Sequence, residues 1–78
     1  MFKEWMINEK GYSWKSAHDV MSRQKRVRNI LNIQKFNTRT IDALEKNTTF
    51  KKLSISVKSQ LRNSVRLSLE FEFKNEKD

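Results

Sequence analysis

The chain carries few residues that could do covalent chemistry. It has no cysteine and one histidine, His18, so it has no thiol nucleophile, disulfide, thiolate zinc site or multi-histidine metal centre. His18 and Asp19 are adjacent, and adjacent residues on a helix point about 100° apart, so they do not form a catalytic pair. Asp42 and Glu45 are expected to be outward charges, and there is no glycine-rich phosphate loop or catalytic serine motif. We therefore expect a protein that is not an enzyme and binds no metal or cofactor.

Two segments instead carry side chains that suit nucleic acid. Arginine presents a planar fork to phosphate or guanine, asparagine can read adenine, and serine can donate a hydrogen bond to phosphate. The nine predicted nucleic-acid-binding residues are Ser22, Arg23, Lys25 and Arg26 in the first segment, and Lys58, Ser59, Arg62, Asn63 and Arg66 in the second.

The net charge points to the same class of ligand. The 78 residues carry 17 Lys and Arg against 9 Asp and Glu, a net charge of +8. Between Lys15 and Arg66 there are 13 basic and 3 acidic residues, so the excess lies within the fold and not in a tail. A basic surface attracts phosphate whatever the base sequence. The alternative is an ordinary solvated surface that is basic without binding anything.

Length and composition favour one small helical domain. One glycine and no proline argue against an all-β sandwich, which needs many tight turns. We expect a single domain over 1–73 and a frayed tail over 74–78. No apolar run approaches the roughly 20 residues of a membrane helix, and the N-terminus lacks the layout of a signal peptide. A cytoplasmic location is therefore expected.

Apolar spacing places the elements that must position the basic residues. A first helix is predicted over 2–10, followed by Gly11 as a left-handed terminator and Ser13 as an N-cap. A second helix is predicted over about 14–32, with its buried stripe formed by Ala17, Val20, Gln24, Val27 and Leu31. Trp5 and Trp14 flank the turn and are expected to lock these two helices together, in preference to serving as a base-stacking platform.

The middle of the chain predicts shorter elements. Asn37 or Thr38 is expected to cap a third helix that buries Ile41 and Leu44. The stretch 47–53 is expected to be a link, with one helical turn that tucks in Phe50 and Leu53.

The last third of the sequence supports two structures. Strict alternation of apolar and polar residues in 65–73 is typical of a strand, so a β-hairpin over 53–73 is one alternative. On a helix, however, an apolar ridge at spacing four is formed by Val57, Leu61, Val65, Leu69 and Phe73. A hairpin would need a turn without glycine that exposes Leu61. We therefore favour an all-α bundle of four to five short helices, with an α+β fold as the alternative.

The residues also resemble a known family. Two helices joined by a glycine–serine turn, and a final serine-rich basic helix ending near an aromatic, are similar to the N-terminal core-binding (SAM-like) domain of tyrosine recombinases, the phage integrases. The resemblance rests on Phe2, Trp5, Met6, Glu9, Lys10, Gly11, Tyr12, Ser13, Ser16, Ala17, Val20, Ser22, Arg23, Arg26, Val27, Ile30 and Leu31, and on Ser56–Leu61 with Arg62, Ser64, Val65, Arg66, Leu67, Leu69, Glu70 and Phe71.

The resemblance implies a helical bundle that grips one face of duplex DNA. By resemblance, backbone contacts would come from Ser22, Arg23 and Arg26 on the second helix and from Ser59, Arg62 and Arg66 on the last. The recombinase catalytic domain, with its nucleophilic tyrosine, is absent from this sequence, so the resemblance implies DNA binding without strand cleavage.

The sequence thus supports two functions. The first is a non-catalytic module that contacts the backbone of duplex DNA through a basic helical face; whether it also accepts RNA is left open. The second is a protein-interaction module or inhibitor that places its basic face on an acidic or nucleic-acid-processing partner. Its other contact, with a partner or a second copy of the chain, would be made by Leu67, Phe71 and Phe73, because these apolar positions extend beyond one stripe.

Overall fold

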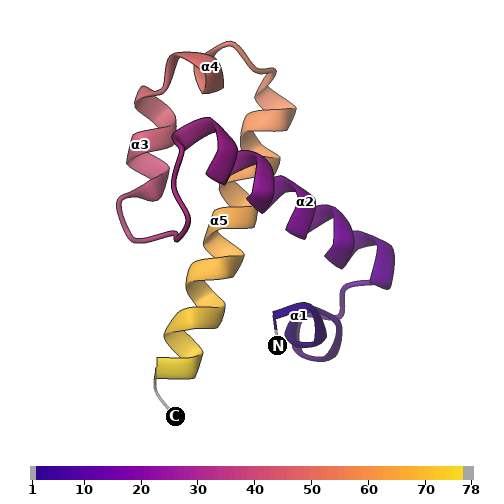
Figure 1. The fold of residues 1–78 in the computed structure, drawn as a ribbon. Helices are drawn as coiled ribbons and strands as arrows, with labels where there is room; N and C mark the ends of the chain where they lie inside the picture. The colour runs from indigo at the N-terminus through magenta and orange to yellow at the C-terminus, as the bar shows by residue number, and fades with distance from the viewer. Residues whose placement is uncertain (1, 77–78) are drawn as a thin grey trace.

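Residues 2–76 form five helices (Figure 1). The computed structural model describes residues 2–76, and no strand occurs among them. The predicted all-α class is therefore confirmed, and the alternative hairpin over 53–73 is wrong. In chain order the helices are α1 (Phe2–Glu9), α2 (Trp14–Leu31), α3 (Thr40–Lys46), α4 (Thr48–Lys51) and α5 (Ile55–Glu76).

The turn between α1 and α2 forms as its residue types predict. The backbone N–H groups of Lys10 and Tyr12 donate to the Met6 carbonyl oxygen at 3.2 and 3.0 Å. Gly11 lies between them with φ of 71°, a left-handed conformation that glycine adopts without strain. The Ser13 hydroxyl oxygen then accepts from the Ser16 N–H at 3.1 Å and caps α2. This turn sets where α2 begins.

Helices α2 and α5 cross at the centre of the molecule (Figure 1). Gln24 Nε2 donates to the Ser64 carbonyl oxygen at 3.0 Å, and both residues are buried. The Ser64 hydroxyl in turn donates to the Leu61 carbonyl oxygen at 2.7 Å. A buried amide without a partner costs about 1–3 kcal/mol, so this bond favours one rotation of each helix about its own axis.

Apolar side chains lie on both sides of this hydrogen bond along α2. Toward the start of α2, Ala17 and Val20 pack with Met6 and Leu67. Toward its end lies the larger cluster, which joins α2 and α5 to the α3–α4 region through Val27, Phe36, Leu44, Phe50, Leu61 and Val65. Helix α5 contributes to both clusters, which explains why its sequence is apolar around more than one stripe.

The segment between α2 and α5 differs from expectation at one cap. Neither Asn37 nor Thr38 is the N-cap of α3; Arg39 holds that position and makes no side-chain cap bond. Asn37 is instead part of a local turn: its N–H donates to Thr40 Oγ1 and its Oδ1 accepts from the Arg39 N–H, both at 2.8 Å. The predicted helical turn in 47–53 is confirmed, because Asn47 caps α4 and Phe50 is buried.

Two other expectations need correction. Trp14 does not lock α1 to α2, because its side chain is 63% exposed. Phe73 is 58% exposed, so the buried part of the predicted apolar ridge of α5 ends one turn earlier. Helix α5 extends through Glu76, and the frayed tail over 74–78 stays a prediction. Residues 77 and 78 lie outside the described residues.

Two apolar side chains of α5 differ in burial, so their truncation is predicted to lower the free energy of unfolding by different amounts. Leu67→Ala removes a side chain that is 7% exposed among Met6, Ala17 and Val20, so we expect a loss of about 2–5 kcal/mol in the free energy of unfolding. Phe73→Ala should cost less, because most of that side chain already meets solvent. Urea unfolding followed by circular dichroism measures both. Equal losses would contradict this placement of the core.

Candidate nucleic-acid interface

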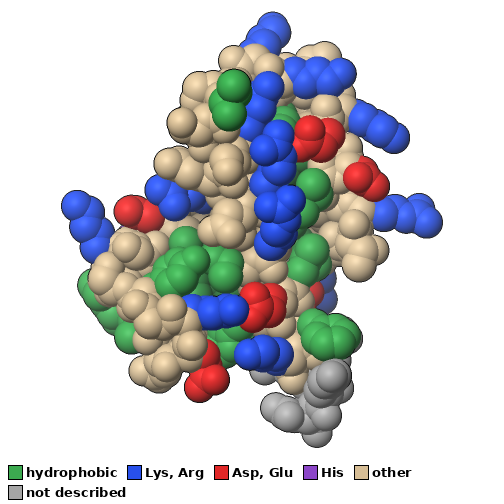
Figure 2. All heavy atoms as spheres, turned by 180° about the vertical axis from the view of Figure 1, so that it is seen from behind, with side chains coloured by type: hydrophobic (Ala, Val, Ile, Leu, Met, Phe, Trp, Pro, Cys, Tyr) green, Lys and Arg blue, Asp and Glu red, His purple; other side chains and the backbone are tan. Residues whose placement is uncertain are grey.

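The outer face of α5 carries a row of cations. Lys58, Arg62 and Arg66 recur at spacing four, so they lie on one side of the helix about 6 Å apart along its axis. Arg66 is exposed and the other two are half-buried. We call these three residues the α5 row. Figure 2 views the molecule from behind and shows a band of Lys and Arg side chains over this region.

The carboxylate of Glu45 lies beside the α5 row. Arg62 Nε donates to Glu45 Oε1, so α3 is linked to α5 by an ion pair. The hydrogen bond from Arg62, followed by attraction to Arg62, Lys58 and Arg66, holds the pKa of Glu45 below its ordinary value against the opposing effect of desolvation. All three cations of the row thus act on one acid. The row retains a surplus of positive charge.

The other predicted residues of α5 flank the row. Ser59 and Asn63 are both exposed, and with Arg66 they follow the spacing i, i+4, i+7 of one helix face. The guanidinium carbon of Arg62 lies 5.5 Å from the centroid of the buried Phe50 ring, which supports the position of this side chain. All five residues predicted on α5 therefore lie on its outward half.

The structure does not bring the α2 residues to the same surface. Gln24 faces α5 and Ser64 faces α2, because the two are hydrogen bonded. Ser22 and Arg26 are each two residues from Gln24, and Arg62 and Arg66 are each two residues from Ser64. At 100° per residue, each pair points about 160° away from the contact between the helices. Ser22 and Arg26 therefore lie on the opposite face from Arg62 and Arg66, and the structure does not gather the two predicted sets into one patch.

Within α2 the predicted set is further divided by the helix. Ser22, Lys25 and Arg26 are exposed, whereas Arg23 is half-buried at the edge of the contact with the rest of the fold. Asp19 precedes Arg23 by four residues and so lies beside it on the helix surface. The α5 residues therefore form the more coherent cationic surface.

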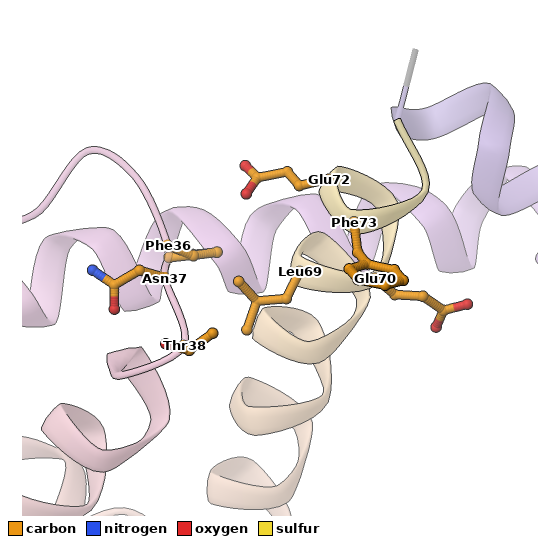
Figure 3. Close-up of a pocket in the computed structure, with 7 residues that line it drawn as sticks. All are labelled: Phe36, Asn37, Thr38, Leu69, Glu70, Glu72 and Phe73. Carbon is orange, nitrogen blue, oxygen red and sulfur yellow. The ribbon is translucent and has the colours of Figure 1, made fainter. Parts of the chain in front are cut away.

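The predicted partner face is mostly used inside the molecule. Leu67 is buried, and Phe71 packs at 5.4 Å from the ring centroids of both Phe2 and Trp5. Phe73 alone of the three is exposed, at the edge of an open groove of about 540 Å³ (Figure 3). Leu69 and Phe36 line this groove from α5 and the loop before α3, and carboxylates of Glu70 and Glu72 lie among its lining residues.

Metal sites and membrane spans were also sought among the described residues. No group of three or more His, Cys, Asp or Glu among residues 2–76 is arranged to hold a metal ion. None of the helices in this part of the chain has the length and apolar character needed to cross a bilayer. Comparison of the chain with protein-family models, curated protein sequences and solved structures finds no match.

Sequence reasoning missed two features of this surface. Glu45 is 17 residues from Arg62, and nothing in local spacing signals that α3 brings its carboxylate to α5. The exposure of Trp14 was also missed, because a tryptophan at a helix start is equally compatible with packing and with exposure.

The ion pair between Arg62 and Glu45 predicts a measurable titration. Because the pKa of Glu45 is lowered in the folded state, the pair contributes stability above the unfolded pKa and loses it as pH falls through the folded pKa. Carbon-detected NMR should therefore show the Glu45 carboxyl titrating below an unperturbed glutamate, and Arg62→Ala should raise its midpoint. A midpoint that does not move in this variant would contradict the pairing.

Proposed function

We propose that this protein is a non-catalytic module that binds duplex DNA through the α5 row. The observation that carries the proposal is the spacing of Lys58, Arg62 and Arg66 on one outward helix face. Glu45 lies beside these cations, and Glu70, one turn beyond Arg66, is ion-paired with Lys10. Long cationic side chains on an exposed helix neutralise phosphates and release their counterions, which supplies affinity without base recognition. Ser59 and Asn63 add short polar groups on the same side, where they can donate to phosphate oxygens.

The resemblance to the core-binding domains of tyrosine recombinases supports duplex DNA as the ligand. It also implies that two helices contact the same duplex, and we do not carry this part over to the present fold. In that arrangement the second helix and the last would contact one face of the duplex. Here the corresponding residues Arg26 and Arg66 belong to opposite faces, because α2 and α5 pack through Gln24 and Ser64. We therefore assign the duplex to α5 alone, with weak sequence preference.

Ion pairing with Glu45 is compatible with this role. The pair is exposed to solvent, and exposed ion pairs are weak because water and salt screen them. Each phosphodiester carries one negative charge, as a carboxylate does, but a duplex presents many of them in a row and can therefore accept the other two cations as well. The duplex backbone therefore competes with Glu45 for Arg62 while Lys58 and Arg66 bind it directly.

A charge-matched pair of variants tests the location. Lys58→Gln/Arg66→Gln and Lys25→Gln/Arg26→Gln each remove two positive charges, the first from the α5 row and the second from α2. The logarithm of duplex affinity should fall linearly with the logarithm of salt concentration, and the α5 variant should lower the slope magnitude by about 1.8, or 0.9 per lost contact. The α2 variant should leave the slope unchanged. Fluorescence anisotropy of a labelled duplex provides the measurement.

Two results would count against the proposal. Equal effects of the two double variants would mean that binding follows net charge and not the α5 row. Absence of salt-dependent binding by the unmodified protein would remove the DNA function itself. Circular dichroism of both variants confirms that the helices are retained.

A second candidate function is favoured by the groove at Phe73. Glu72 lines it with Leu69 and Phe36, whereas Glu70 is ion-paired with Lys10. The Glu72 carboxylate fits a second copy of this basic chain better than an acidic protein. If the groove is a self-association site, sedimentation should show a mass that rises with concentration, and Phe73→Ser should abolish the rise. A monomer at every concentration would exclude this candidate and leave the proposed DNA function untouched.

A further inference from the structure

The exposed tryptophan begins α2 and lies about 80° around the helix axis from Gln24, the residue that contacts α5. Trp14 is 63% exposed, the second-highest exposure among the large hydrophobic side chains of the described core and surface. The Lys3 ammonium lies 3.9 Å from the centroid of its ring. The ring thus combines an open apolar surface with a fixed positive charge beside it.

The residues that follow Trp14 on this side of α2 form a continuous exposed stripe. His18, Met21 and Lys25 follow at i+4, i+7 and i+11, the spacing of one helix face, and all of them are exposed. No acidic residue belongs to this stripe. Asp19, the one acid in α2, is offset from Trp14 by about 140° around the helix axis. We call Trp14, His18, Met21 and Lys25 the Trp14 stripe.

We infer that the Trp14 stripe binds single-stranded nucleic acid, with Trp14 as a base-stacking platform. Exposed aromatic rings among cations are the usual means by which proteins hold single strands, because every base has a face that can stack. His18 lies one turn from Trp14 and offers a second ring at about 6 Å along the helix. Lys3 and Lys25 at the two ends supply charges for the phosphates.

The chemistry of stacking selects a single strand over a duplex. Bases in a duplex are stacked on their neighbours and paired through their edges, so their faces are not accessible to a side-chain ring. The α5 row has no exposed aromatic among its cations and therefore does not discriminate in this way. The two surfaces are expected to take different forms of nucleic acid.

Fluorescence of Trp14 provides a direct test. In a Trp5→Phe background Trp14 is the only tryptophan, and a thymidine oligonucleotide of about 12 nucleotides should quench its emission on binding. In the unmodified background, Trp14→Ala should weaken binding of the labelled oligonucleotide about fivefold or more, the effect of losing one stacked base. Trp14→Phe should retain more affinity than Trp14→Leu, because only phenylalanine keeps a ring. Phe73→Ala, which removes an exposed aromatic at the far end of α5, is the matched control and should have no effect.

The two surfaces can be separated in the same experiment. Single-strand binding should survive Lys58→Gln/Arg66→Gln, and duplex binding should survive Trp14→Ala. If Trp14→Ala leaves single-strand affinity unchanged, if leucine rescues as well as phenylalanine, or if a duplex quenches Trp14 as strongly as the oligonucleotide, the inference is overturned. Single-strand binding that instead fails in the α5 variant would also overturn it, while leaving the proposed duplex function intact.

Discussion

The buried hydrogen bond from Gln24 to Ser64 decides which surfaces of this protein face outward. It lies where α2 crosses α5, with apolar clusters packed along α2 on both sides of it. Rotation of either helix would strip the Gln24 amide of its acceptor in a place that water does not reach, which costs more than an exposed bond of the same kind. Because Arg26 is about half a turn from Gln24, and Arg62 and Arg66 are about half a turn from Ser64, the bond that holds the helices together also directs these cations to opposite faces. The distribution of charge is a consequence of packing.

Separation of the cations lowers the electrostatic cost of a small basic fold. A chain of 78 residues has a small hydrophobic core, and its net charge of +8 makes the cationic side chains repel one another. The small core supplies little stabilising free energy to offset that repulsion. On α5 that repulsion is relieved locally, since Lys58, Arg62 and Arg66 all act on Glu45. At the start of α2, the Lys3 ammonium lies over the Trp14 ring. The ion pair at Glu45 and the contact between Lys3 and Trp14 both lie at the surface and are weak. A phosphate or a base could therefore replace either interaction without unfolding the protein.

Local chemistry determined what the sequence could predict. The Gly11 turn and the Ser13 cap depend on neighbours within four residues, and both form as expected. Helix α5 was favoured over a hairpin because its apolar ridge and the turn that a hairpin would need both depend on adjacent residues. The common basic patch, in contrast, required knowledge of how α2 is rotated against α5, and Glu45 required the position of α3. Both depend on how the helices pack against one another, which the spacing of residues within one helix does not predict.

The placement of the two surfaces on different sides of different helices would allow the two proposed ligands to be bound at once. The molecule measures 35 × 26 × 17 Å, and α2 lies in front of α5 in Figure 1. The α5 row points about 120–160° away from the contact with α2, whereas the Trp14 stripe lies about 60–120° around α2 from its contact with α5. Exposed charges separated by more than the Debye length, about 8 Å at physiological salt, are largely screened from one another. A duplex on α5 would therefore repel a single strand on α2 only weakly. With one ligand form on each face, the protein would hold a duplex and a single strand together, the arrangement found wherever the two strands of a duplex separate.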